Sequence, residues 1–145
     1  MIYTPLTNKA MRLAYDAHQG QTDKGGLPYV FHPYHLAEQM PDEASVCVAL
    51  LHDVVEDADV SFEELERSFP SEVVDAVRLL TRQPGVDYLD YVRAIKSDPI
   101  AVRVKLADLA HNSDESRLAG CKDVSRTEIT RLRKRYAEAR ALLEG

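Results

Sequence analysis

The sequence predicts an all-α protein. Apolar residues recur three and four positions apart along most of the chain, whereas the apolar and polar alternation typical of strands is nearly absent. Two capping-box patterns, Ser61 with Glu64 and Ser125 with Glu128, indicate the starts of two helices. At 145 residues the chain can bury one sizeable core, so we expect a single compact helical bundle over residues 1–145.

The first half of the chain predicts helices of increasing burial. An apolar stripe over residues 6–17 indicates the first helix, and the following segment, residues 20–33, contains the glycines and prolines of a loop. Pro33 suits the first position of a short helix that ends at Gln39. Residues 42–57 are apolar on most faces, which indicates a buried central helix.

The second half predicts further helical segments with apolar stripes, at residues 61–69, 73–80, 87–96, 99–118 and 125–143. Pro84 and Gly85 separate the second of these from the third, and Pro99 restarts the chain after the third. No internal repeat, low-complexity segment or linker divides the chain, which supports one domain.

Charge and composition exclude several classes of protein. The net charge is −6, with −9 on residues 1–72 and +3 on residues 73–145. An acidic protein is a poor candidate for sequence-independent nucleic-acid binding, which depends on many lysine and arginine contacts to phosphate. The apolar runs are too short to cross a bilayer, and the N-terminus lacks a secretory signal, so we expect a cytoplasmic location. Cys47 and Cys121 are predicted to be unpaired thiols.

Four ionisable residues interrupt the apolar central segment. His52 and Asp53 directly follow an apolar run, and Glu56 and Asp57 lie one helical turn later. In a helix, His52 neighbours Glu56 and Asp53 neighbours Asp57. A buried carboxylate without a partner costs a large part of a domain's net stability, so Asp53 requires a cation. We interpret that cation as a metal ion.

Two other segments offer matching ligands. Asp108 and Asn112 lie four residues apart and follow a stretch with apolar residues. His32 precedes a proline that restricts its backbone. A metal ion held between these segments could take His32, His52, Asp53 and Asp108. Two imidazole nitrogens and two carboxylate oxygens with open positions suit Mn²⁺, Fe²⁺ or Zn²⁺, and the residues alone do not distinguish these metals.

Other interpretations of the same residues stay open. Asp53 could form a buried salt bridge with Lys105 or Arg103, which would position no chemistry. Glu56 and Asp57 could be a solvated helix end, although acidic residues at a helix C-terminus oppose the macrodipole. Histidines are commonly structural, and we interpret three of them in this way: His18, His35 and His111.

The combination of motifs resembles a known family. "HDVVED" at residues 52–57 occurs together with His32 and with "KLADLAHN" at residues 105–112, in a specific order and spacing. These motifs resemble the HD-domain metal-dependent phosphohydrolases, and more closely the hydrolase domain of the Rel/Spo family and the small alarmone hydrolases. The matching segments cover most of the chain, at residues 15–38, 48–82 and 101–118.

The resemblance assigns roles to individual residues. It implies a Mn²⁺ site whose ligands are His32, His52, Asp53 and Asp108. It implies that Glu56 and Asp57 orient or deprotonate the attacking water. Lys24 matches a basic position that contacts substrate phosphate, and Asn112 matches a position that contacts the nucleotide. Tyr136 lies where the family presents an aromatic ring to the nucleotide, and plain core packing is an open alternative for it.

The resemblance also implies an activity, namely hydrolysis of the 3′-pyrophosphate of guanosine 3′,5′-bis(diphosphate), (p)ppGpp, to GDP or GTP and pyrophosphate. No segment resembles the family's synthetase domain, so we expect degradation of the alarmone and no synthesis. Two alternatives are an HD phosphohydrolase acting on another phosphorylated nucleotide such as NADPH, and a non-catalytic sensor that binds the alarmone. Each implies a small-molecule nucleotide as the partner.

Two positions depart from the family pattern. Asp23 stands where many members carry an arginine, and Ala58 stands where threonine is common. The first departure removes a cation close to the substrate phosphates. We expect three cations of the more basic half to reach phosphate: Lys105, Arg117 and Lys122. The remaining cations of interest are interpreted as solvated helix faces, namely Arg103, Arg131, Arg133, Lys134 and Arg135.

Overall fold

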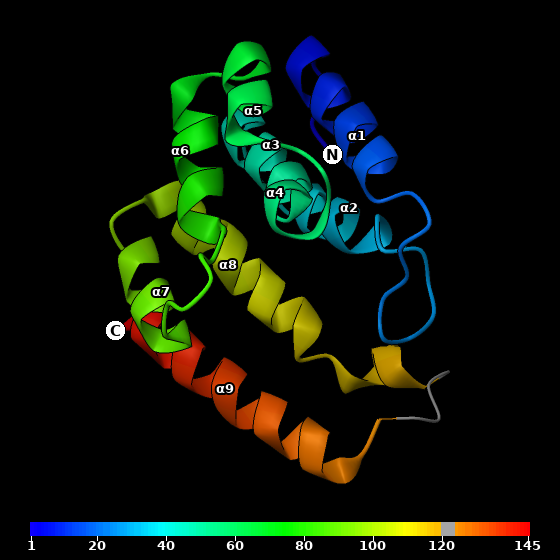
Figure 1. Ribbon diagram of the computed structural model, residues 1–145, viewed down its shortest axis with the longest axis vertical. Coiled ribbons are helices and arrows are strands. Elements are labelled where there is room, and N and C mark those ends of the chain that lie inside the picture. Colours follow the sequence, from blue (N-terminus) through cyan, green and yellow to red (C-terminus); the bar gives the residue numbers. More distant parts are fainter. Residues whose placement is uncertain (120–123) are drawn as a thin grey trace.

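The computed structural model describes residues 1–119 and 124–145, and within these ranges it confirms the all-α prediction (Figure 1). The first half forms α1 (Pro5–Ala17), α2 (Phe31–Glu38), α3 (Glu43–Leu51), α4 (Val54–Asp57) and α5 (Phe62–Ser68). The second half forms α6 (Ser71–Leu80), α7 (Tyr88–Ile95), α8 (Pro99–Asn112), the short 3₁₀ helix η1 (Glu115–Leu118) and α9 (Arg126–Glu144).

Side-chain caps fix where several helices begin. The side-chain oxygens of Ser61 and Ser125 accept hydrogen bonds from the backbone N–H groups of Glu64, at 3.2 Å, and Glu128, at 3.1 Å. Each bond satisfies a donor that has no partner within its own helix. Both predicted helix starts are therefore confirmed.

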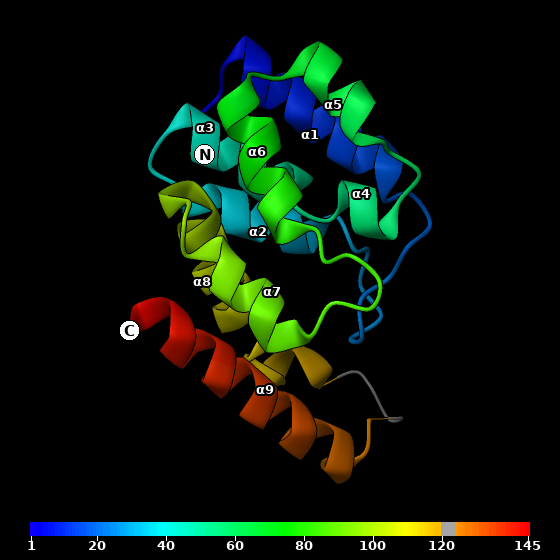
Figure 2. The same ribbon diagram turned by 60° about the vertical axis from the view of Figure 1, so that its left-hand side comes forward.

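Helix α3 forms the centre of the core. Every residue from Ser45 to Leu51 is buried. Helices α1, α2, α6 and α8 pack around α3, and α9 lies along α7 and α8 (Figures 1 and 2). This packing explains why the central segment is apolar on most faces.

The predicted central helix over residues 42–57 is wrong in one respect, because it consists of two helices. Helix α3 ends at Leu51, and Asp53 has φ −110° and ψ 0°, which is not a helical conformation. The backbone N–H of Asp57 still donates to the carbonyl of Asp53 at 2.9 Å. Glu56 and Asp57 thus belong to the four-residue α4, so the macrodipole argument for a long helix does not apply to them.

Helix α2 begins two residues earlier than predicted. Pro33 is its third residue and not its first. The first-turn N–H groups of a helix have no acceptor within the helix, so a proline that lacks this N–H is accommodated there as well. The earlier start places His32 inside the first turn of α2.

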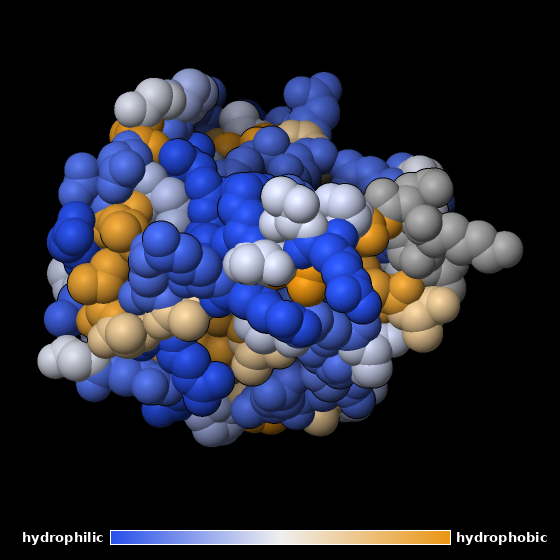
Figure 3. All heavy atoms as spheres, turned by 90° about the horizontal axis from the view of Figure 1, so that it is seen from below, coloured by the Kyte–Doolittle hydropathy of each residue, from blue (hydrophilic) through white to orange (hydrophobic). Residues whose placement is uncertain are grey.

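The remaining features of the described residues concern their surface and thiols. Seen from below, the surface is mostly hydrophilic, with apolar residues in separate patches (Figure 3). No helix in the described ranges is long and apolar enough to cross a membrane. The thiol of Cys47 is buried and unpaired, whereas Cys121 lies outside the described residues.

Candidate metal centre and active site

Four side chains from three parts of the chain meet at the C-terminal end of α3. His32 comes from α2, His52 and Asp53 from the turn between α3 and α4, and Asp108 from α8. The distance from His32 Nε2 to Asp108 Oδ1 is 2.8 Å, and His52 Nε2 lies 3.0 Å from Asp53 Oδ2 and 3.6 Å from Asp108 Oδ1. Ligand atoms of His32, His52 and Asp53 all lie within 4.8 Å of one another. The structure thus brings together the four residues predicted as metal ligands.

The protonation of His52 fits a metal ion at this cluster. Its Nδ1 lies 2.6 Å from the carbonyl oxygen of Ala49, which can only accept, so Nδ1 carries a proton and donates it. The buried Nε2 makes no hydrogen bond among the described residues and faces the carboxylates of Asp53 and Asp108, whose charges outweigh burial and raise the pKa of His52 well above its usual range. A divalent metal ion would take the place of the Nε2 proton at this position, and imidazole with carboxylate ligands suits such an ion.

Charges around the cluster keep Asp108 ionised. Burial by itself raises the pKa of Asp108, but Lys105, His32 and His52 outweigh burial and hold this pKa well below its usual range. The Lys105 ammonium donates to Asp108 Oδ2 at 3.0 Å. The alternative salt bridge from Lys105 to Asp53 is therefore wrong, and so is the one from Arg103, whose guanidinium lies 4.0 Å from Asp42.

Tyr29 is a residue that the sequence analysis missed. Its hydroxyl donates a hydrogen bond to Asp53 Oδ2, and its ring packs 4.9 Å from that of His18 and 5.7 Å from that of His32. The hydrogen bond orients the carboxylate of Asp53. Hydrogen bonds of this kind hold metal ligands in the geometry that a metal ion requires.

Replacement of Tyr29 by phenylalanine should weaken divalent metal binding by about 10- to 100-fold, because the Asp53 carboxylate loses the donor that orients it. Calorimetric titration of Mn²⁺ into both proteins measures the change. Tyr15→Phe is a matched control, since Tyr15 is 57% exposed. Equal Mn²⁺ affinity of Tyr29→Phe and the wild type would contradict this role.

Two further histidines support the cluster. His111 Nδ1 lies 2.7 Å from His32 Nδ1, and the two rings are stacked with an interplanar angle of 4°. Burial, with the nearby Arg117, lowers the pKa of His111 to about 4, which keeps His111 neutral at physiological pH. His18 is buried and lies 2.8 Å from Gln21 Oε1 through Nδ1. This contact agrees with the interpretation of His18 as structural. His111, in contrast, contacts a predicted metal ligand, which its position one turn after Asp108 in the same helix could have indicated.

Glu56 and Asp57 lie beside the predicted metal ligands. Their carboxylate oxygens and that of Asp53 lie within 4.8 Å of one another. Glu56 Oε1 accepts a hydrogen bond from the backbone N–H of Arg82 at 2.9 Å. Partial desolvation, together with the Asp53 charge, raises the pKa values of both Glu56 and Asp57. Raised carboxylate pKa values favour proton transfer near neutral pH.

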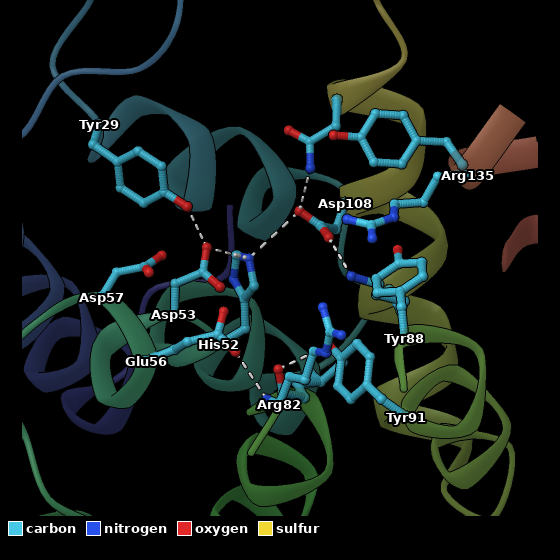
Figure 4. A pocket seen from close by; sticks show the side chains of 14 residues that line it. Tyr29, His52, Asp53, Glu56, Asp57, Arg82, Tyr88, Tyr91, Asp108 and Arg135 are labelled. Carbon is cyan, nitrogen blue, oxygen red and sulfur yellow. Dashed lines mark hydrogen bonds and ion pairs between the residues drawn. The ribbon is translucent and has the colours of Figure 1, made fainter. Parts of the chain in front are cut away.

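These groups share a hollow of about 250 Å³ with cations and aromatic rings (Figure 4). His52, Asp53, Glu56 and Asp57 line one side. The other side carries Arg82, Tyr88, Tyr91 and Arg135, and Lys105 also lines the hollow. The interpretation of Arg135 as a solvated residue is therefore wrong, because its guanidinium lies against the ring of Tyr88 inside the hollow.

A second hollow of about 330 Å³ adjoins the first and contains the residues predicted to contact substrate. Lys24, Asn112 and Tyr136 all line it, and the last two also line the first hollow. Asn112 Nδ2 donates to Asp108 Oδ1 at 3.0 Å, and Lys24 Nζ lies 4.0 Å from Glu128. Tyr136 is half-buried and faces both hollows, which favours a contact role over plain core packing.

The structure also explains the departure at Asp23. Its carboxylate accepts hydrogen bonds from the N–H groups of Gly25 and Leu27, and it pairs with the Arg117 guanidinium at 3.2 Å. Asp23 is therefore neutralised and supplies no free negative charge to the second hollow. Of the other two cations expected to reach phosphate, Lys105 is paired with Asp108 and Lys122 lies outside the described residues.

Replacement of Gly25 by alanine should destabilise the fold by about 1–3 kcal/mol, because the new Cβ would lie 2.3 Å from the backbone oxygen of Arg117. Urea unfolding measures the difference. Leu27→Ala, at a side chain that is 56% exposed, should change stability far less. Unchanged stability of Gly25→Ala would show that the segment around Gly25 can move away from Arg117 without a cost in folding free energy.

An all-α fold with two histidines and two aspartates at this site defines a class, the HD domain. Residues 10–132 match the family model described as HD domain, so the chain belongs to this family. It is 32% identical to the bifunctional (p)ppGpp synthase/hydrolase SpoT of Escherichia coli K12, over 72% of this chain and 18% of SpoT. It is 34% identical to a probable guanosine-3′,5′-bis(diphosphate) 3′-pyrophosphohydrolase of Synechocystis, over 74% of this chain and 16% of that relative. The predicted resemblance to Rel/Spo proteins is confirmed, and the chain spans less than a fifth of the length of these relatives.

A solved structure supports the same fold. It is described as a metazoan ortholog of SpoT that hydrolyzes ppGpp and plays a role in starvation responses. The two structures superimpose with a TM-score of 0.84 at 24% identity, over 100% of this chain and 89% of the other. At this level of identity the likeness shows the HD-domain fold.

Proposed function

We propose that this domain hydrolyses the 3′-diphosphate of guanosine 3′,5′-bis(diphosphate) and of the corresponding pentaphosphate, with a divalent metal ion, Mn²⁺ in the first instance, as cofactor. The products are GDP or GTP and pyrophosphate. The observation that carries the proposal is the proximity of the His32, His52, Asp53 and Asp108 cluster to the acidic pair Glu56 and Asp57 in one hollow. Homology to proteins named as 3′-pyrophosphohydrolases supports the choice of substrate.

Each side chain has a defined task in this proposal. A divalent metal ion supplies Lewis-acid polarisation of a phosphoryl oxygen and makes water a stronger acid near neutral pH. Glu56 and Asp57 orient the attacking water and take its proton, to which their raised pKa values are suited. Tyr29 and Lys105 hold the ligands Asp53 and Asp108 by the hydrogen bonds described above.

The second hollow is proposed to hold the nucleoside. Tyr136 offers an aromatic face, and Asn112 and Lys24 offer hydrogen-bond donors to base, ribose or 5′-phosphate. Because Asn112 and Tyr136 line both hollows, a nucleotide in the second hollow can place its 3′-diphosphate in the first.

Release of pyrophosphate from guanosine tetraphosphate by the purified protein tests the proposal. We expect release with added Mn²⁺ and none after chelation. Parallel reactions with NADPH and guanosine pentaphosphate define the substrate. Faster release of phosphate from NADPH would replace this substrate with the alternative nucleotide. Tight binding of the tetraphosphate without cleavage would identify a sensor and reject hydrolysis.

A further inference from the structure

Two arginines in the first hollow have no task in the chemistry proposed above. Arg82 directly follows the C-cap of α6, and Arg135 lies in the middle of α9. Both are half-buried and line the hollow on the side away from Asp53 and Asp57 (Figure 4). Their guanidinium carbons lie 5.5 Å and 4.5 Å from the centroid of the Tyr88 ring. The Tyr88 ring thus makes cation–π contacts with both guanidinium groups, and the Lys105 ammonium lies 5.8 Å from the same ring.

Arg82 and Arg135 differ from most other arginines of α9, the helix that contains Arg135. Three of those arginines pair with glutamates, at distances of 2.6–2.8 Å: Arg131 with Glu128, Arg133 with Glu115 and Arg140 with Glu144. Within residues 1–119 and 124–145, Arg82 and Arg135 make no such ion pair. Arg82 Nε donates to the carbonyl of Val86 at 2.9 Å, which leaves its terminal nitrogens available.

The third cation on this side is already neutralised. The Lys105 ammonium is 3.0 Å from Asp108 Oδ2 and donates to it. The free positive charge that faces this part of the hollow therefore comes from the two guanidinium groups. A guanidinium binds phosphoryl oxygens through two parallel N–H donors, and two such groups suit an anion with more than one phosphoryl group.

We propose that Arg82 and Arg135, held against Tyr88, form an anion clamp that binds the terminal phosphoryl group of the substrate and selects a diphosphate over a monophosphate. This inference rests on the proposed function and adds the residues that determine its specificity. The clamp contacts the phosphoryl group that departs with pyrophosphate, so the clamp binds the free product as well.

Binding of inorganic pyrophosphate and of inorganic phosphate to chelator-treated protein, measured by calorimetry at low ionic strength, tests the clamp without turnover. We expect the wild type to bind pyrophosphate more tightly than phosphate. Arg135→Gln and Arg82→Gln should each weaken pyrophosphate binding by roughly 10- to 100-fold, which is the range for hydrogen bonds between charged groups. Each variant should also have a smaller ratio of pyrophosphate affinity to phosphate affinity than the wild type.

Matched variants separate the clamp from general effects. Arg131→Gln and Arg140→Gln each remove a cation of the same helix whose charge is paired, with Glu128 and with Glu144; both variants should bind pyrophosphate like the wild type. Circular dichroism verifies that each variant is folded. Wild-type pyrophosphate affinity in folded Arg135→Gln, or an unchanged ratio of pyrophosphate to phosphate affinity, would overturn the clamp.

The two proposals fail in different ways. Protein that binds pyrophosphate through both arginines but releases none from guanosine tetraphosphate supports the clamp and contradicts the proposed function. Protein that turns over the tetraphosphate equally well with and without the two arginines supports the function and contradicts the clamp.

Discussion

Replacement of Asp53 by alanine is expected to abolish tight binding of divalent metal. Asp53 is 3.0 Å from His52 Nε2 and belongs to both groups of potential metal ligands at the site. Loss of a ligand should exceed the roughly 10- to 100-fold effect that is typical of losing a residue that only supports a ligand. Asp53→Ala should therefore bind Mn²⁺ more weakly than Tyr29→Phe does.

Metal binding should also increase the stability of the folded protein. A ligand present at 100 times its Kd stabilises the folded state by about 2.7 kcal/mol, which raises the Tm of a domain of this size by several degrees. Thermal unfolding with and without Mn²⁺ measures this shift. We expect the shift in the wild type and in the control Asp59→Ala, whose side chain is exposed, and none in Asp53→Ala. An equal shift in all three proteins would remove Asp53 from the ligand set.

Replacement of Glu56 by glutamine is expected to lower kcat by about 100- to 10,000-fold, the range for a lost general acid or base. Glutamine keeps the Oε1 atom that accepts the Arg82 N–H, so the local structure should be preserved. It loses the ability to take a proton from water. Steady-state release of pyrophosphate measures kcat, and calorimetry with Mn²⁺ measures metal binding.

The contrast between the two variants is the decisive result. Glu56→Gln should bind Mn²⁺ like the wild type and turn over slowly, whereas Asp53→Ala should lose both properties. Glu63→Gln, an exposed glutamate of α5, should keep both. Equal metal loss in Glu56→Gln and Asp53→Ala would assign Glu56 to the metal and not to the water.

Local features of the chain were sufficient to predict most helices. The capping serines Ser61 and Ser125 act through backbone groups three residues away, and the apolar stripes repeat every turn, so both are visible in a short stretch of sequence. The break between α3 and α4 was missed because no proline or glycine lies there. Instead, Asp53 departs from helical dihedral angles where its side chain enters the cluster, whereas the preceding His52 still has them.

The candidate site could also be predicted only in part from local sequence. The set of predicted ligands could be proposed from motifs, because histidine and aspartate at buried positions already imply a cation. The meeting of these side chains at one place could not be predicted in this way, because His32 and Asp108 are 76 residues apart and meet only when α2 and α8 pack on α3.

The sequence by itself determined the helical class, the single core and the residue types able to hold a metal ion. Only the tertiary structure decided that Tyr29 orients Asp53, that His111 contacts His32, and that Arg135 faces the hollow instead of solvent. The physical reason is distance along the chain. Helix propensity and capping depend on neighbours within a turn, whereas hydrogen bonds and charge compensation in a hollow depend on which distant segments the packed core brings together.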